Sequence, residues 1–207
     1  MTKNWKIAAA SLAALSFGLA TPAAAASLII DANGQLRGAS DVNVGGTLYD
    51  VEFADGTCIE IFSGCDEVSD FTFTNYFDAR EASQALLDQV FLGEFNDDPT
   101  LTFGCDEMDY CRSLNPYTFV DFGDGLRTRD NTAVNGSIGI NDYTTDFYNR
   151  RDLDLSTRSG FNYAVFSLAD GVGAVPEPGT WLMMLLGFGF VGGMMRQRKQ
   201  DTRVSYT

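Results

Sequence analysis

The stretch Leu48-Tyr49-Asp50-Val51-Glu52-Phe53-Ala54-Asp55-Gly56-Thr57-Cys58-Ile59-Glu60-Ile61-Phe62 decides the fold class. From Tyr49 to Phe53, apolar and acidic side chains alternate, which is the pattern of a half-buried strand. The turn-forming pair Asp55-Gly56 follows, and residues 57–62 are again mostly apolar. The stretch therefore predicts a β-hairpin, and with it a β-rich domain.

Two registers are possible for this hairpin. A two-residue turn at Asp55-Gly56 would pair Val51 with Glu60, an apolar side chain with a charged one. A three-residue loop with Gly56 in the left-handed conformation pairs Val51 with Ile59 instead. We prefer the second register because it gives one continuous apolar face.

The rest of the body adds strands and one helix. Asp78 can cap the helix, with Glu81 completing a capping box, and the helix should end near Gly93. Residues 31–46 are rich in Gly, Asn and Asp, so we expect turns there. Strands are expected at residues 28–30, 71–74, 101–103, 117–122, 137–140 and 161–168, the last one an inner strand, with an Asn135-Gly136 turn before 137. The prediction is a mainly β, sandwich-like domain with one short helix.

The chain ends differ in character from this body. Residues 1–26 are typical of a secretory signal peptide, with Lys3 and Lys6 before an apolar middle and Ala24-Ala25-Ala26 before the expected signal peptidase cleavage between Ala26 and Ser27. A retained N-terminal membrane helix is the alternative. The exported domain is then residues 27–174, which is long enough to bury a core.

Residues 180–195 form an uncharged apolar run near the C-terminus. As a helix these 16 residues would span roughly 24 Å, slightly less than the ~30 Å hydrocarbon core of a bilayer. A Pro-Glu-Pro triplet precedes the run, and a basic stop at residues 196–203 follows it. The run is predicted to be a transmembrane helix; a buried core helix and an ordinary tail anchor are the alternatives. The residues are Pro176, Glu177, Pro178 for the triplet and Arg196, Arg198, Lys199, Arg203 for the stop.

This tail, residues 175–199, resembles the PEP-CTERM sorting signal of Gram-negative bacteria. The resemblance implies recognition by an exosortase, a membrane transpeptidase-like enzyme, and a transient membrane anchor that is cut near the triplet. It further implies transit through the inner membrane, display at the cell surface or in the extracellular matrix, and an association with exopolysaccharide. It implies no activity for the body.

Charge limits the partners of the body. Residues 27–175 hold 26 of the 28 acidic residues and eight of the 14 basic ones, all arginine, so their net charge is −18. Such a surface repels nucleic acid and anionic lipid. The chain has no histidine. This excludes Ser-His-Asp and Cys-His catalysis and histidine-ligated metal sites within the chain.

Four cysteines, Cys58, Cys65, Cys105 and Cys111, allow three disulfide pairings. Export favours disulfides, and close spacing favours Cys58–Cys65 and Cys105–Cys111. A four-thiolate metal site is the alternative, although paired C-x-x-C spacing is absent.

Other candidate sites in the body are less specific. Acid clusters at residues 66–67, 97–98 and 106–109 suit calcium or a carboxylate pair of a glycan-acting enzyme, but solvated loops are the explanation we prefer. Residues 142–151 are polar and aromatic, and we expect an exposed recognition loop there. We predict no cofactor and no enzymatic activity. The expected function is structural or adhesive; the alternatives are a secreted carboxylate-dependent enzyme and a calcium- or glycan-binding module.

Overall fold

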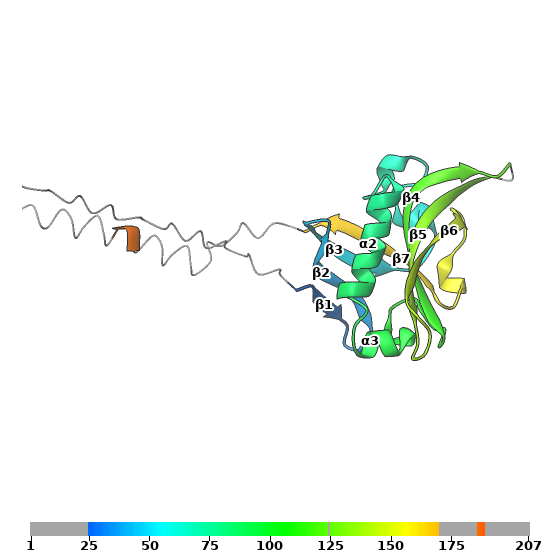
Figure 1. The fold of residues 1–207 in the computed structure, drawn as a ribbon. Helices are drawn as coiled ribbons and strands as arrows, with labels where there is room; N and C mark the ends of the chain where they lie inside the picture. Colours follow the sequence, from blue (N-terminus) through cyan, green and yellow to red (C-terminus); the bar gives the residue numbers. More distant parts are fainter. Residues whose placement is uncertain (1–24, 124, 170–185, 189–207) are drawn as a thin grey trace, which may run out of the picture. The chain divides into compact units, whose positions relative to one another are not determined.

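In the computed structural model, one sheet has the strand order β1-β2-β3-β7-β4-β5-β6 (Figure 1). The structure describes residues 25–123, 125–169 and 186–188. The strands are β1 (Ser27–Ile30), β2 (Leu36–Val44), β3 (Thr47–Ala54), β4 (Tyr110–Asp121), β5 (Leu126–Gly136), β6 (Tyr143–Arg150) and β7 (Phe161–Leu168). The helices are α1 (Cys58–Ile61), α2 (Tyr76–Gln89) and α3 (Glu94–Asp97), with 3-10 turns η1 (Val68–Asp70), η2 (Pro99–Leu101) and η3 (Leu155–Thr157).

The sheet joins two antiparallel groups through a central strand. Strands β1, β2 and β3 are antiparallel neighbours, as are β4, β5 and β6. Strand β7 lies between the groups and runs parallel to β4, where Ser113 pairs with Asn162. The mainly β class with one helix longer than a turn or two is confirmed. The described strands form a single sheet, however, so the second layer is α2 rather than another sheet.

Each face of the sheet carries its own apolar core. Side chains on a strand alternate between faces, and β7 shows both cores: Ala164 and Phe166 belong to one cluster, Tyr163 to the other. The first cluster, the helix-face core, includes the inner stripe of α2 (Ala79, Ala82, Leu86), and Figure 1 shows α2 lying across the sheet. The second, the disulfide-face core, contains Cys58, Cys65, Phe62, Phe71, Leu114 and Leu155. The predicted inner strand at 161–168 is therefore confirmed.

The predicted hairpin partner of β3 is wrong. Residues 58–61 form helix α1, because Thr57 and Glu60 make a capping box: Thr57 Oγ1 accepts the N–H of Glu60, and Glu60 Oε2 accepts that of Thr57, both at 3.2 Å. Strand β3 pairs instead with β2, which covers much of the region predicted to be turns. Gly45 and Gly46, both with positive φ, make the tight turn between them.

Helix α2 is confirmed, but its predicted cap is wrong. Asn75 is the N-cap, and its Oδ1 accepts the N–H groups of Phe77 and Asp78 at 3.0 and 3.1 Å. Asp78 lies in the first turn and accepts a hydrogen bond from Asn75 Nδ2. The helix ends at Gln89, and Gly93 precedes α3 instead.

Other strand predictions fail for local reasons. Residues 71–74 form bends and irregular backbone and join no strand, and residues 101–103 contribute an isolated bridge from Thr102 to Leu36. The strand expected at 117–122 begins at Tyr110. Asn135-Gly136 ends β5, and the turn follows it, so 137–140 is not a strand.

Candidate functional site

The predicted sorting signal lies outside the described residues. This holds for Pro176, Glu177, Pro178, for Arg196, Arg198, Lys199, Arg203, and for the apolar run apart from 186–188, which are helical. In the described ranges no helix is both long and apolar enough to cross a membrane. Of the predicted cleavage pair, Ala26 packs partly against the helix-face core and Ser27 begins β1. Cleavage at this bond stays a prediction.

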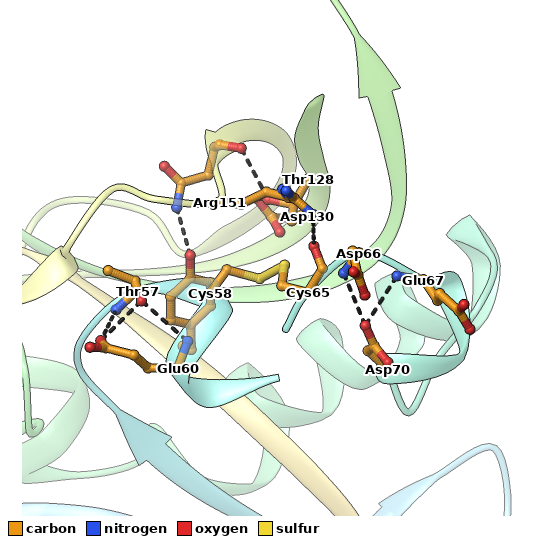
Figure 2. Close-up of a disulfide and its surroundings, with 12 residues drawn as sticks. Thr57, Cys58, Glu60, Cys65, Asp66, Glu67, Asp70, Thr128, Asp130 and Arg151 are labelled. Atoms are coloured by element: carbon orange, nitrogen blue, oxygen red, sulfur yellow. Dashed lines mark hydrogen bonds between the residues drawn. A yellow bond between two sulfur atoms is a disulfide. The ribbon is translucent and has the colours of Figure 1, made fainter. Parts of the chain in front are cut away.

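Both predicted disulfides are confirmed. Cys58 and Cys65 are joined with their Cα atoms 5.7 Å apart, and Cys105 and Cys111 with theirs 5.5 Å apart. No cysteine is free, which rules out the four-thiolate metal site. Figure 2 shows that the Cys58–Cys65 bridge closes the α1 turn, with Arg151 donating from Nη1 to the Cys65 carbonyl at 2.7 Å.

Acidic side chains in or beside two of the three clusters act as local caps. Asp70 Oδ2 accepts the N–H groups of Asp66 and Glu67 at 3.0 and 3.1 Å (Figure 2), and Asp98 Oδ1 accepts that of Thr100 at 3.0 Å. Within the described residues, no three acidic or cysteine side chains gather closely enough to hold a metal ion. The absence of a calcium site in the whole protein stays a prediction.

The structure brings four arginines together beside strand β6. A pocket of about 290 Å³ is lined by Arg127, Arg150, Arg151, Asp152 and Ile59, among others. A second pocket, of about 230 Å³, is also lined by Arg127 and Arg150, and adds Arg158. Because the two pockets share two lining residues, we treat them as one surface feature, the arginine cleft.

Aromatic and apolar residues line the second pocket of the arginine cleft. Phe147 and Phe161 contribute rings 5.5 Å apart, and Leu153 and Leu155 contribute aliphatic groups, whereas the ring of Tyr148 lies on the other face of the sheet against Phe122. Asn149 lines the same pocket and donates to the hydroxyl of Tyr163 at 2.7 Å. The cleft thus combines positive charge with an apolar wall, a set of groups that small-molecule sites commonly use.

The arginine cleft is fixed to the disulfide face of the sheet. The segment after β6 bonds to the α1 region through Ile59 N to Arg151 O at 3.4 Å and Leu155 N to Gly56 O at 2.9 Å. Arg150 makes a two-point ion pair with Asp152, at 3.0 Å from Nε and 2.8 Å from Nη2. The hydrogen bond from Arg150 lowers the pKa of the Asp152 carboxyl. Asp152 therefore stays ionised and orients Arg150.

A buried carboxyl lies behind the cleft. Asp130 of β5 is fully buried, and Thr128 Oγ1 lies 3.1 Å from its Oδ2 and 3.3 Å from the Asn149 carbonyl. Burial raises the pKa of Asp130 to about 8, although the Thr128 hydrogen bond opposes the shift. Burial also raises the pKa of the Tyr163 phenol. Asp130 is therefore mostly neutral at neutral pH.

The predicted recognition loop at 142–151 is wrong in structure, because residues 143–150 form strand β6 at the edge of the sheet. Several of its residues nevertheless line the cleft. Sequence reasoning missed Arg127 and Arg158. A signal was available, since five of the eight arginines of the body fall between residues 127 and 158.

A larger hollow of about 670 Å³ lies at the start of the sheet. It is lined by Ala25, Ala26, Glu81 and Asp88, among others. Ala25 and Ala26 precede the predicted signal peptidase cleavage bond, so this hollow would lose part of its wall in the mature chain. We therefore do not treat it as a candidate site.

The tail of the chain resembles a known family model. Residues 174–199 match the model of the PEP-CTERM protein-sorting motif. The chain carries a PEP-CTERM motif. The match includes the Pro-Glu-Pro triplet, the apolar run and the bases up to Lys199, whereas Arg203 lies beyond it. The motif implies export, membrane transit and exosortase processing before surface display. Comparisons with curated proteins and with solved structures found no match.

Proposed function

We propose that this protein is an exported structural or adhesive component of the cell surface or extracellular matrix, associated with exopolysaccharide and held at the membrane only until its PEP-CTERM tail is cut. The match at residues 174–199 carries the proposal. The body supports it: two disulfides suit an oxidising compartment outside the cytoplasm. We assign the body no catalytic step and no cofactor.

The sequence around the triplet suits a transient anchor. Pro178 disfavours helix at Glu177, so the sequence predicts an extended backbone before the apolar run, which would leave it accessible to a membrane enzyme. The bases after the run favour the cytoplasmic side of the membrane. Cleavage near the triplet would remove the apolar run and free the body.

Two tags on one chain test this proposal. One tag follows Thr207, and the other is inserted at Ile138-Gly139, an exposed turn where a side chain added to Gly139 would meet no atom within 4 Å. In a host with an active exosortase, immunoblots of surface fractions should show the internal tag without the C-terminal one. The matched control replaces Pro176, Glu177 and Pro178 by alanine, and it should keep both tags.

The opposite result would identify a permanent anchor. If the C-terminal tag persists on the unaltered protein in that host, the tail is not removed and the proposal fails. Screening the purified protein against polysaccharides tests the carboxylate-dependent enzyme alternative. A calcium-dependent rise in melting temperature would favour the calcium-binding alternative.

A further inference from the structure

The arginine cleft is positively charged, whereas the body as a whole carries a net negative charge. The body has a net charge of −18 and eight arginines. Four of these eight line the cleft, and among all its lining residues Asp152 is the one acid. The cleft therefore has a formal excess of positive charge on an otherwise acidic surface. Such a local reversal attracts the anionic groups that enter the cleft, while the surrounding acids weaken the binding of every long polyanion.

Two of the arginines are held in place by the fold. Arg151 donates to the Cys65 carbonyl, and Arg150 is paired with Asp152. Arg158 is the C-terminal cap residue of η3, and its side chain is exposed at the cleft. Guanidinium groups match the planar geometry of a carboxylate better than lysine does. Fixed arginines also lose less conformational entropy when they bind a ligand.

The aromatic wall narrows the class of anion. The rings of Phe147 and Phe161, which form this wall, lie 5.5 Å apart in the same pocket as Arg158. A sugar ring has an apolar face that packs on aromatic rings, hydroxyl groups that accept hydrogen bonds from arginine, and, in an acidic sugar, a carboxylate. Each pocket is at or below the lower end of the ~300–1,000 Å³ range of ligand sites, which suits one sugar unit at a time.

We propose that the arginine cleft binds the carboxylate-bearing sugar units of an acidic polysaccharide, with arginines on the carboxylate and the aromatic wall on the ring. This inference rests on the proposed function, to which it adds a ligand class and a site. The net charge of −18 opposes every long polyanion, nucleic acid included, so a carboxylated sugar is favoured by guanidinium–carboxylate pairing and by packing of its ring on Phe147 and Phe161.

The test is a binding titration on the full chain, purified in detergent micelles, with a polyuronate oligosaccharide. Arg158→Gln and Arg127→Gln should each weaken binding by about tenfold, because each removes a charge-assisted hydrogen bond donor. The matched control is Arg80→Gln, an exposed arginine of α2 that lines neither pocket, and it should bind as the unaltered protein does. Added salt should weaken binding of the unaltered protein.

Further probes separate the competing anions. A neutral glucan, inorganic sulfate and single-stranded DNA should all bind more weakly than the polyuronate. Equal binding of sulfate or DNA would overturn the sugar assignment, and equal binding of the glucan would overturn the role of charge. Circular dichroism and intact disulfides confirm that each variant is folded. If folded Arg158→Gln and Arg127→Gln variants bind polyuronate normally, the site is wrong.

The tag experiment distinguishes this failure from failure of the proposed function. Arg158 lies outside the sorting motif at residues 174–199, so the Arg158→Gln variant should still lose its C-terminal tag and reach the surface. Loss of the tail with no polyuronate binding would refute the ligand and leave the sorting role intact. Retention of the tail would refute the sorting role whatever the cleft binds.

Discussion

At the scale of single residues, Asp130 is a carboxyl that the fold keeps neutral. Its pKa is raised from 3.8 to about 8 because burial penalises the charged form. Since the folded pKa lies above the unfolded one, the stabilising contribution is complete below about pH 4 and is lost as the pH rises through about 8. Asp130 therefore makes the protein less stable at neutral and alkaline pH than at mildly acidic pH.

We expect Asp130→Asn to remove this pH dependence. The amide has the shape of the protonated carboxyl and cannot ionise, so the variant should gain roughly 2 kcal/mol or more in unfolding free energy at pH 8, and little at pH 4. Urea unfolding between pH 4 and 9 measures the difference. Asp97→Asn, at an exposed site on α3, is the control and should follow the unaltered protein. A constant difference at all pH values would show that ionisation of Asp130 is not the cause.

At the scale of elements, the sequence predicted those that depend on local pattern. The alternation in 49–53 and the two-faced apolar run at 161–168 fixed strands β3 and β7, and the apolar stripe fixed α2. The partner of β3 was missed because Thr57 and Glu60 form a cap that competes with an extended chain. Strand β2 was missed because Gly38 and its polar residues suggest turns, while its burial depends on packing with α2, which is distant in sequence.

Strand β2 requires glycine at position 38. A Cβ atom there would lie 2.0 Å from the carbonyl oxygen of Val51 on β3, which is backbone and cannot move aside. We expect Gly38→Ala to lower the unfolding free energy by roughly 3 kcal/mol or more, or to prevent folding. Gly34→Ala, whose Cβ would meet no atom within 4 Å, should cost about 1 kcal/mol for its positive φ. Equal urea midpoints for the two variants would contradict this account.

At the scale of the whole molecule, the sequence allowed the sorting motif to be predicted but not the arginine cleft. The sorting motif is contiguous, so its order of triplet, apolar run and bases could be recognised without a structure. The arginine cleft is assembled from the start of β5, the end of β6 and the η3 region, and its shape depends on the α1 turn held by Cys58–Cys65. Arg127 and Arg150 come together because they are paired across β5 and β6. Such pairing depends on register, which the sequence alone left open.

The two disulfides should therefore have similar effects on stability and different effects on the cleft. Each closes a short loop, so replacing either pair by alanine should cost about 2–3 kcal/mol in unfolding free energy. The Cys58→Ala/Cys65→Ala variant should also loosen the segment after β6, because Arg151 donates to the Cys65 carbonyl and Leu155 to Gly56. Hydrogen exchange under native conditions measures this at the N–H groups of Ile59 and Leu155.

The Cys105→Ala/Cys111→Ala variant is the matched control, and it should leave those two N–H groups protected once the difference in global stability is subtracted. Equal exchange in both variants would show that the Cys58–Cys65 bridge stabilises the domain as a whole without holding the cleft.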